Sequence, residues 1–286
     1  SDRLKLSPNG QQVRVRSVHT HNVIVDQGES GERVGLNITG QGLKFAHVGR
    51  GHWIFSEELY SSTSCFDAEV KLIDSELKGL KVLNRVQLHI GTAQITARMV
   101  FIGGNVPEVG APSYAQIVLS KPVNALFGDY FILRNAGANR IIGGGRIIDP
   151  FASRSGRNQP SRIKHLNALD TTEISKVLKA LLDMSPAGFD IKTFMLSRNI
   201  SDEFIQQELS RNHIHRIKIK REVKVFSNFH WKNLSENIIE VLKDASSADL
   251  MEPGLNIKDL RRGIETSLSS RVILKIIYDL VAECRV

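Results

Sequence analysis

Short runs of alternating apolar and polar residues fill the first half of the chain. Leu4 and Leu6 precede Pro8-Asn9-Gly10, and the alternation resumes at Val13. Because Asn-Gly accepts positive φ at both positions, this pattern predicts a β-hairpin. Further strands are expected at residues 33–38, 53–55, 67–73, 85–90, 94–102, 115–119 and 130–134. Many short strands separated by turns are typical of all-β domains, and we expect two small barrels, at residues 1–60 and 61–149.

A helical period replaces the alternation in the second half. Apolar residues recur three and four positions apart behind residues 170–173 (DTTE), which we interpret as a capping box with Glu173 bonding back to the cap. A short helix is expected after Asp190 and another from Ser201, and alternation from Ile214 to Val225 then predicts a hairpin. Three helices followed by a hairpin is the order of a winged helix, which we expect at residues 166–230.

The same helical order then begins again. Asn233 and Glu236 are expected to cap a helix through Leu242, a second helix covers residues 257–262, and a third opens at Ser269 or Ser270. The third helix should carry a wide apolar stripe of Val272, Ile273, Ile276, Ile277, Leu280 and Val281. Residues 231–286 are therefore expected to form a second winged helix that stops before its hairpin. The predicted fold class is multi-domain, β followed by α+β.

The segment between the two halves is strongly basic. Against the single acid Asp149 it holds four cations, Arg154, Arg157, Arg162 and Lys164. Glycine and proline among them favour an exposed linker, which we expect at residues 150–165. Contact with phosphate is the alternative for this segment.

The charge of the whole chain favours a polyanionic partner. The formal net charge of the 286 residues is +8, and nucleic acid is the simplest such partner, although many basic proteins bind none. No apolar run approaches the ~18 residues of a membrane span, so no membrane partner is expected. Cys65 and Cys284 have no metal-ligand spacing and fit a reducing, cytoplasmic location.

No pattern in the sequence supports a catalytic or metal site. Residues 143–145 (GGG) are followed by Arg146-Ile147, whereas a phosphate-binding loop needs Lys and Ser or Thr before a helix. We interpret the glycines as a barrel turn. His19 and His21 could share a strand face but lack a nearby third ligand, so structural or RNA-facing roles are favoured. We expect no metal and no cofactor in this chain.

Several strand segments resemble translation factors. Residues 31–37 (GERVGLN) and 48–53 (VGRGHW) resemble the second domain of elongation-factor-type GTPases. Residues 88–98 (LHIGTAQITAR), 128–134 (GDYFILR) and 143–150 (GGGRIIDP) are similar to the third domain of the selenocysteine-specific elongation factor family. That family has winged helices after the barrels, whereas elongation factor Tu lacks them. The resemblance covers nearly the whole chain, and its most specific element is the order of the domains.

The resemblance implies a segment of the factor that delivers selenocysteyl-tRNA to the ribosome at recoded UGA codons. In the family, GTP and Mg²⁺ are bound by a GTPase domain that precedes these barrels, and the last two of four winged helices bind the selenocysteine insertion hairpin of mRNA. We expect this chain to lack those parts and to be a monomer. The alternatives are a segment of another elongation- or initiation-type GTPase and a winged-helix DNA-binding regulator.

The resemblance also suggests residues that contact the aminoacyl-tRNA. Arg33 matches an arginine of the family's aminoacyl pocket, where a guanidinium would distinguish an ionised selenol from a serine hydroxyl. A solvent-facing arginine at a strand start is the alternative. In the family the third domain contacts the acceptor and T arms of tRNA. The candidates for tRNA backbone contacts are His89, Thr92, Arg98 and Arg134, of which the two arginines could equally be structural.

In the first winged helix, one expected element disfavours contact with nucleic acid and another favours it. Its expected third helix should place Asp202, Glu203 and Glu208 outward, where they would repel phosphate, and this disfavours a DNA regulator. The expected hairpin is basic instead. Its candidates for RNA contact are Arg216, Lys218, Lys220 and Arg221. The alternatives are an edge hairpin that lysines protect from strand pairing, and modules that act mainly as a spacer.

Overall fold

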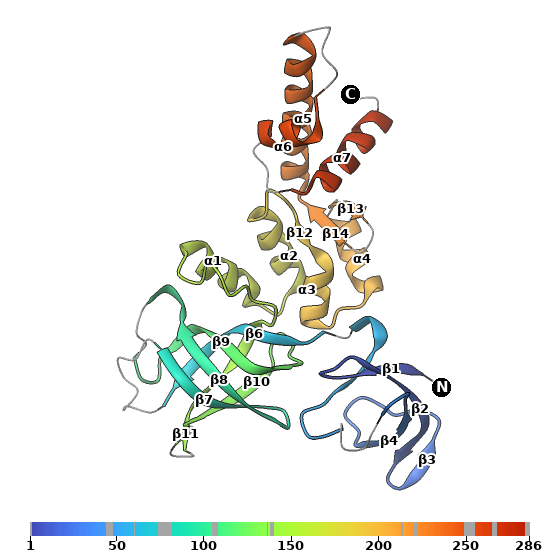
Figure 1. Cartoon of the computed structure of the whole chain (residues 1–286), viewed down its shortest axis with the longest axis vertical. Coiled ribbons are helices and arrows are strands. Elements are labelled where there is room, and N and C mark those ends of the chain that lie inside the picture. The colour runs from blue at the N-terminus through green and yellow to red at the C-terminus, as the bar shows by residue number, and fades with distance from the viewer. Residues whose placement is uncertain are drawn as a thin grey trace. The chain divides into compact units, whose positions relative to one another are not determined.

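The chain divides into two compact units, residues 1–166 and 167–286. The computed structural model describes residues 2–43, 48–59, 61–73, 82–104, 108–135, 137, 140–212, 214–219, 222–248, 255–264 and 268–283. Strands, coloured blue to green, make up most of the first unit, and helices, coloured yellow to red, dominate the second (Figure 1). The predicted fold class, β followed by α+β, is confirmed.

The first sheet contains five strands. They are β1 (Arg3–Leu6), β2 (Gln11–Thr20), β3 (Val23–Val25), β4 (Val34–Thr39) and β5 (Ile54–Ser56), followed by a short 3₁₀ turn at Glu57–Leu59. The predicted hairpin is β1–β2, with Leu4 opposite Val13 and Gly10 at a φ of 67° in the turn. The long strand β2 also pairs with β3 and β4, and β5 pairs with β1. The barrel expected at residues 1–60 stays a prediction, since the described strands form a sheet here.

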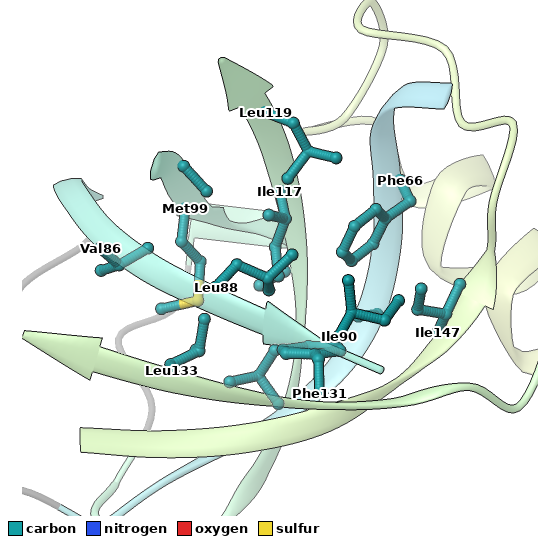
Figure 2. Packing of buried hydrophobic residues seen from close by; sticks show 14 of the residues in the cluster. Phe66, Val86, Leu88, Ile90, Met99, Ile117, Leu119, Phe131, Leu133 and Ile147 are labelled. Carbon is teal, nitrogen blue, oxygen red and sulfur yellow. The ribbon is translucent and has the colours of Figure 1, made fainter. Parts of the chain in front are cut away.

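Six antiparallel strands close into a barrel. They are β6 (Thr63–Leu72), β7 (Val82–Ile90), β8 (Ala93–Phe101), β9 (Pro112–Val123), β10 (Tyr130–Asn135) and β11 (Ile141–Asp149), in the order β10-β11-β6-β9-β8-β7. Pairing of β10 with β7 closes the ring. Phe66, Leu88, Met99, Ile117 and Leu133 gather inside it and are fully or almost fully buried (Figure 2). Each such side chain stabilises the fold by ~1.5–3 kcal/mol through burial alone.

The glycine run lies inside strand β11, so its interpretation as a turn is wrong. All three glycines pair with β6 on one side and with β10 on the other. A Cβ on Gly145 would lie 2.1 Å from the carbonyl oxygen of Glu69, and a Cβ on Gly143 would lie 2.5 Å from that of Lys71. Neighbouring backbones come too close here for any side chain, which is why the strand needs glycine.

The linker prediction for residues 150–165 is wrong in its second half. Helix α1 (Pro160–Leu169) begins there, and proline suits a first helical position because its missing N–H would have no helical partner. Arg162 of α1 donates from Nε to Oδ2 of Asp67 on β6 at 2.6 Å, and its second guanidinium nitrogen donates to the carbonyl oxygen of Ser153 at 3.2 Å. The helix therefore begins as an attachment to the barrel, and Arg162 is not an exposed linker cation.

The second unit opens with the element order of a winged helix. Its elements are α2 (Ile174–Asp183), β12 (Phe189–Asp190), α3 (Ile191–Arg198), α4 (Asp202–Arg211), β13 (His215–Ile219) and β14 (Glu222–Phe226), with the sheet order β12-β14-β13. Asp190 and Ser201 cap α3 and α4 through their side chains. The predicted capping box is wrong: Glu173 is itself the residue before α2, makes no side-chain cap bond, and pairs with Lys176 at 2.7 Å.

Three more helices complete the second unit. They are α5 (Asn228–Ala248), α6 (Ile257–Gly263) and α7 (Ser270–Ala282). Asn233 and Glu236 do not cap α5, which starts five residues earlier at Asn228 behind Ser227, whose hydroxyl accepts from the backbone N–H of His230. Of the apolar stripe predicted on α7, Val281 is 50% exposed and the other members are buried or partly buried. None of the described helices is long and apolar enough to cross a membrane.

The hairpin and the last three helices share one hydrophobic core. Ile217 of β13 and Phe226 of β14 lie in a buried cluster with Trp231, Ile238 and Ile276 of the helices. Val223 and Val225, in turn, are fully buried on β14. One side of the hairpin is therefore occupied by α5–α7 and is not open for contact with nucleic acid.

Candidate nucleic-acid interface

Positive charge is concentrated in the first unit. Residues 1–166 contain 20 basic and 13 acidic side chains, a net charge of +7, whereas residues 167–286 contain 18 and 17, a net charge of +1. Because the phosphates of a nucleic acid supply most of the electrostatic attraction to a basic protein, the barrel half is the favoured place for such contact.

The outside of the closed barrel carries a band of polar side chains across β8, β7 and β10. Leu88 is buried, so the alternation of β7 turns Gln87 and His89 outward. His89 lies opposite Ile132 of β10, and Gln87 lies opposite Arg134. His89 and Arg134 are both half-buried, and Nε2 of His89 makes no hydrogen bond within the described part of the chain.

Strand β8 continues this band on the other side of β7. Gln94 lies opposite His89, and Thr96 lies opposite Gln87, whose side-chain amide donates to the Thr96 hydroxyl at 3.2 Å. Arg98 follows two residues later on the same face and is exposed. The structure thus brings three of the four tRNA candidates, His89, Arg98 and Arg134, onto one outer face. The glutamines and Thr96 between them were missed, although the alternation of residues 88–98 could have identified them.

The fourth candidate, Thr92, has a structural partner. It stands in the turn between β7 and β8, and its hydroxyl accepts from the backbone N–H of Gly51 at 2.9 Å. Gly51 has a φ of 87°, and a Cβ added to it would lie 2.6 Å from that of Ala93. Thr92 therefore ties the segment around Gly51 to the barrel through its hydroxyl, which acts there as an acceptor.

Arg33 lies at the end of the first sheet. It directly precedes β4, and the pairing of Thr20 with Val34 places it beside the turn of His21 and Asn22, both of which have positive φ. Its side chain is exposed. An exposed guanidinium makes weak ionic contacts unless a bound ligand excludes water. Its role in selecting an aminoacyl group stays a prediction.

His19 and the glycine run both have partners within the chain. Nε2 of His19 lies 3.0 Å from the hydroxyl of Ser17. Within the described residues no group of three or more His, Cys, Asp or Glu side chains could hold a metal ion. The glycine run, for its part, uses its backbone in the ladders of β6 and β10.

Two of the four hairpin candidates for RNA contact lie among the described residues. Arg216 and Lys218 are exposed on β13, whereas Lys220 and Arg221 lie outside the described residues. The exposed pair flanks Ile217, which is 2% exposed and packs toward the helices. Within the described part of the hairpin, Arg216 and Lys218 therefore stay open for RNA contact on the side of β13 opposite Ile217.

The acidic third helix, α4, is less acidic on its surface than expected. Asp202 and Glu203 are exposed as predicted. Glu208 is only 8% exposed and pairs with Arg211 at 3.0 Å, so its outward placement is wrong. It occupies the inner side of the helix because it lies three residues from Ile205 and next to Leu209, both buried. Two outward acids still oppose phosphate on this helix.

Comparison with known proteins finds a family model that matches the closed barrel. The family model described as the selenocysteine-specific elongation factor, beta-barrel domain, matches residues 67–154. Those residues run from β6 through β11 into the following segment and include every outward candidate on β7, β8 and β10.

The similar proteins bear the same description. The selenocysteine-specific elongation factor of Desulfomicrobium baculatum is 25% identical over 187 residues, which cover 65% of this chain and 29% of that protein. The corresponding factor of Haemophilus influenzae is 26% identical over 177 residues, covering 60% and 27%. The chain therefore spans less than a third of the length of these curated relatives.

A solved structure has the same fold. The crystal structure of a bacterial selenocysteine-specific elongation factor, EF-Sec, matches 98% of this chain and 42% of its own, with a TM-score of 0.65 and 21% identity. The match extends over both the strand-rich and the helical unit.

Proposed function

We propose that this chain is a segment of a selenocysteine-specific elongation factor, because that family's model matches its barrel and its relatives carry that description. Its barrel half would then bind selenocysteyl-tRNA for delivery to the ribosome at recoded UGA codons. The observation that supports this most strongly is that the family match and the outward band coincide on residues 67–154, within the unit that carries the excess of positive charge. The family match, the excess of positive charge and the outward band of His89, Arg98 and Arg134 all fall on this barrel or its unit. Phosphate contacts of such a band would position the tRNA without reading its sequence.

The described residues do not fit GTP and Mg²⁺, the cofactors implied by the family. A phosphate cradle needs free backbone N–H groups at a loop that leads into a helix. The glycine run instead lies within β11, where the strand is paired on both sides. We therefore assign no step of GTP hydrolysis to these residues. The ribosome and the selenocysteine insertion hairpin of mRNA are proposed as partners of the whole factor.

Arg33 is proposed to select the aminoacyl group. A selenol is largely ionised at neutral pH, whereas a serine hydroxyl is neutral, so a guanidinium covered by the bound aminoacyl end would favour selenocysteine. A charge-assisted contact of this kind contributes ~1.5–3 kcal/mol. The exposed position of Arg33 beside a tight turn leaves it accessible to such a ligand.

Arg33→Ala is expected to lower the preference for selenocysteyl-tRNA over seryl-tRNA by about tenfold in the full-length factor, which is ~1.4 kcal/mol. The two dissociation constants would be measured side by side by protection of the aminoacyl ester from hydrolysis. Arg16→Ala, which removes another exposed arginine from the same sheet, is the matched control. An unchanged ratio for Arg33→Ala would remove this role.

Replacement of the outward arginines tests the proposed tRNA contact itself. Arg98→Ala is expected to weaken binding of the tRNA by about threefold to tenfold and to reduce the salt dependence by roughly one phosphate contact, because one cation is lost. Binding would be measured by fluorescence anisotropy over a series of salt concentrations. Lys121→Ala, an exposed lysine on β9 of the same barrel, controls for net charge. Equal losses in the two variants would mean that only the overall charge matters.

A further inference from the structure

The closed barrel has a second outer feature, on β6, β11 and β10. It is a shallow hollow of about 370 Å³, lined by Glu69, Lys71, Ile73, Tyr130, Gly144 and Arg146, and we call it the glycine-floored groove. The strand pairing determines which of these side chains lie beside one another. One row across the strands holds Glu69, Arg146 and Tyr130, and the next holds Lys71, Gly144 and Ile132.

The hollow exists because Gly144 has no side chain. A Cβ on Gly144 would lie 2.8 Å from the carbonyl oxygen of Phe131, so the close approach of β10 and β11 prevents a larger residue. Both neighbouring strands, in contrast, carry long side chains outward at this row, Lys71 and Ile132. The outer surface is consequently lowered between two ridges, and the backbone forms its floor.

The wall formed by β10 presents an exposed aromatic ring. Phe131 is 3% exposed inside the barrel, so alternation turns Tyr130 outward, and 76% of its surface is open. Ile73 on the opposite side is 60% exposed. An aromatic ring that is open to solvent at the rim of a shallow groove can stack on a flat ligand without a deep pocket.

The charges at the groove are arranged unevenly. Nη2 of Arg146 lies 3.9 Å from Oε2 of Glu69, so the carboxylate balances part of the positive charge of Arg146. Lys71 is exposed and forms no ion pair with any residue that the structure describes. The strongest attraction for an anion is therefore at Lys71, one row along from Tyr130.

We propose that the glycine-floored groove binds an unpaired nucleotide of an RNA strand, with its base stacked on Tyr130 and its phosphate against Lys71. A planar base suits the open ring, and a phosphate suits both the lysine and the net charge of +7 on this unit. The inference rests on the proposed function in one respect, namely that the ligand is an RNA. It adds a second contact surface on β6, β11 and β10, beside the outward band on β8, β7 and β10, and a preference for single strands.

The test uses the full chain and a fluorescein-labelled, unstructured RNA of about eight nucleotides, close to the site size of other single-strand binders. Tyr130→Ala is expected to weaken binding of this strand about tenfold, because base stacking is lost, whereas Tyr130→Phe keeps the ring and the affinity. Lys71→Ala should weaken binding and reduce the salt slope by about 0.7. Glu69→Gln should strengthen binding by removing repulsion of the phosphate.

Matched controls separate the groove from general charge effects. Tyr278→Ala removes a tyrosine of similar exposure, 70%, from helix α7 of the other unit and should leave RNA binding unchanged. The same strand annealed to its complement should bind with equal affinity to the wild-type chain and to Tyr130→Ala. Competition with unlabelled tRNA and with the mRNA hairpin identifies which RNA supplies the nucleotide.

Three results would overturn the proposal. They are equal affinity of Tyr130→Ala and the wild-type chain for the single strand, equal loss in Tyr130→Phe and Tyr130→Ala, and binding of a polyglutamate peptide with the same dependence on Tyr130. A parallel measurement of tRNA binding distinguishes failure of the groove proposal from failure of the proposed function. Normal tRNA binding without single-strand binding would remove the groove site alone, and the reverse result would remove the proposed function alone.

Discussion

Arg162→Ala is expected to lower the free energy of unfolding of the first unit by about 3–5 kcal/mol, the usual cost of removing one partner from a buried ion pair. The side chain of Asp67 is fully buried and that of Arg162 is 12% exposed. Nε of Arg162 lies 2.6 Å from Oδ2 of Asp67. Burial raises the pKa of the Asp67 carboxyl, while the hydrogen bond from Arg162 acts to lower it. Without the guanidinium, the only side-chain hydrogen bond left to Asp67 among the described residues would come from the amide of Gln116, which donates to it at 3.2 Å.

Urea unfolding of the full chain measures this loss. Lys164→Ala on the same helix removes an exposed cation and should change the free energy of unfolding by no more than about 0.5 kcal/mol. Adding Asp67→Asn to Arg162→Ala should recover part of the stability, because the uncompensated charge disappears. A loss below about 1 kcal/mol in Arg162→Ala would contradict the role of the pair.

The same variant should show a distinctive dependence on pH. With Arg162 absent, the pKa of Asp67 in the folded state should rise further above its unfolded value. A carboxyl with a raised folded pKa is destabilising when ionised, so the deficit of Arg162→Ala should be full at neutral pH. It should shrink as the pH falls through the raised pKa and Asp67 becomes neutral. A deficit that grows in acid would mean that Asp67 is not the group responsible.

Phe226→Ala is expected to lower the free energy of unfolding of the second unit by about 3–5 kcal/mol, as large core truncations do. Phe226 is 0% exposed at the end of β14, and its ring centre lies 5.7 Å from that of Trp231 on α5. On its other side, a Cβ added to Gly188 would lie 2.8 Å from the ring. The side chain therefore joins the winged-helix elements before it to the helices after it, and its removal leaves a cavity between them.

Circular dichroism and tryptophan fluorescence would follow this change during urea unfolding. Because the hairpin shares its core with α5–α7, we expect the helical signal of the second unit to be lost in one step in both the wild-type chain and Phe226→Ala. Phe229→Ala removes a phenylalanine that is 68% exposed and should cost no more than about 0.5 kcal/mol. Separate transitions for α2–α4 and α5–α7 in the wild-type chain would contradict a shared core.

The starts of α3 and α4 were predictable from local cap signals, whereas the equally local signals at residues 170–173 and at Asn233 and Glu236 were misleading. Asp190 accepts from the N–H of Lys192 at 3.1 Å, and Ser201 accepts from that of Phe204 at 3.3 Å. Each cap lies within three residues of its partner, so a short stretch of sequence contains all the chemistry. His89, Arg98 and Arg134 were suggested by the resemblance, and the alternation of β7, β8 and β10, which is also local, explains why all three lie on the outer face.

Features that depend on distant partners were not predictable. Asp67 and Arg162 are separated by 95 residues, so the basic composition of residues 150–165 gave no sign that one arginine would be buried. Glu208 was placed outward because a carboxylate usually faces solvent, but its helix packs with that side inward. The groove was missed because its floor is defined by the absence of side chains at Gly144, which a sequence shows only as a run of small residues.

The attachment of helix α1 also changes where the barrel can be cut. The sequence suggests a module that ends at residue 149, after the last strand, but such a module would leave Asp67 without Arg162 and Gln116 without the Ser153 carbonyl to which it donates at 2.9 Å. A protein of residues 61–149 is expected to be less soluble and less stable than one of residues 61–169. Exchange of this barrel between proteins, by recombination in evolution or in the laboratory, would therefore succeed only when the helix that follows it is transferred as well.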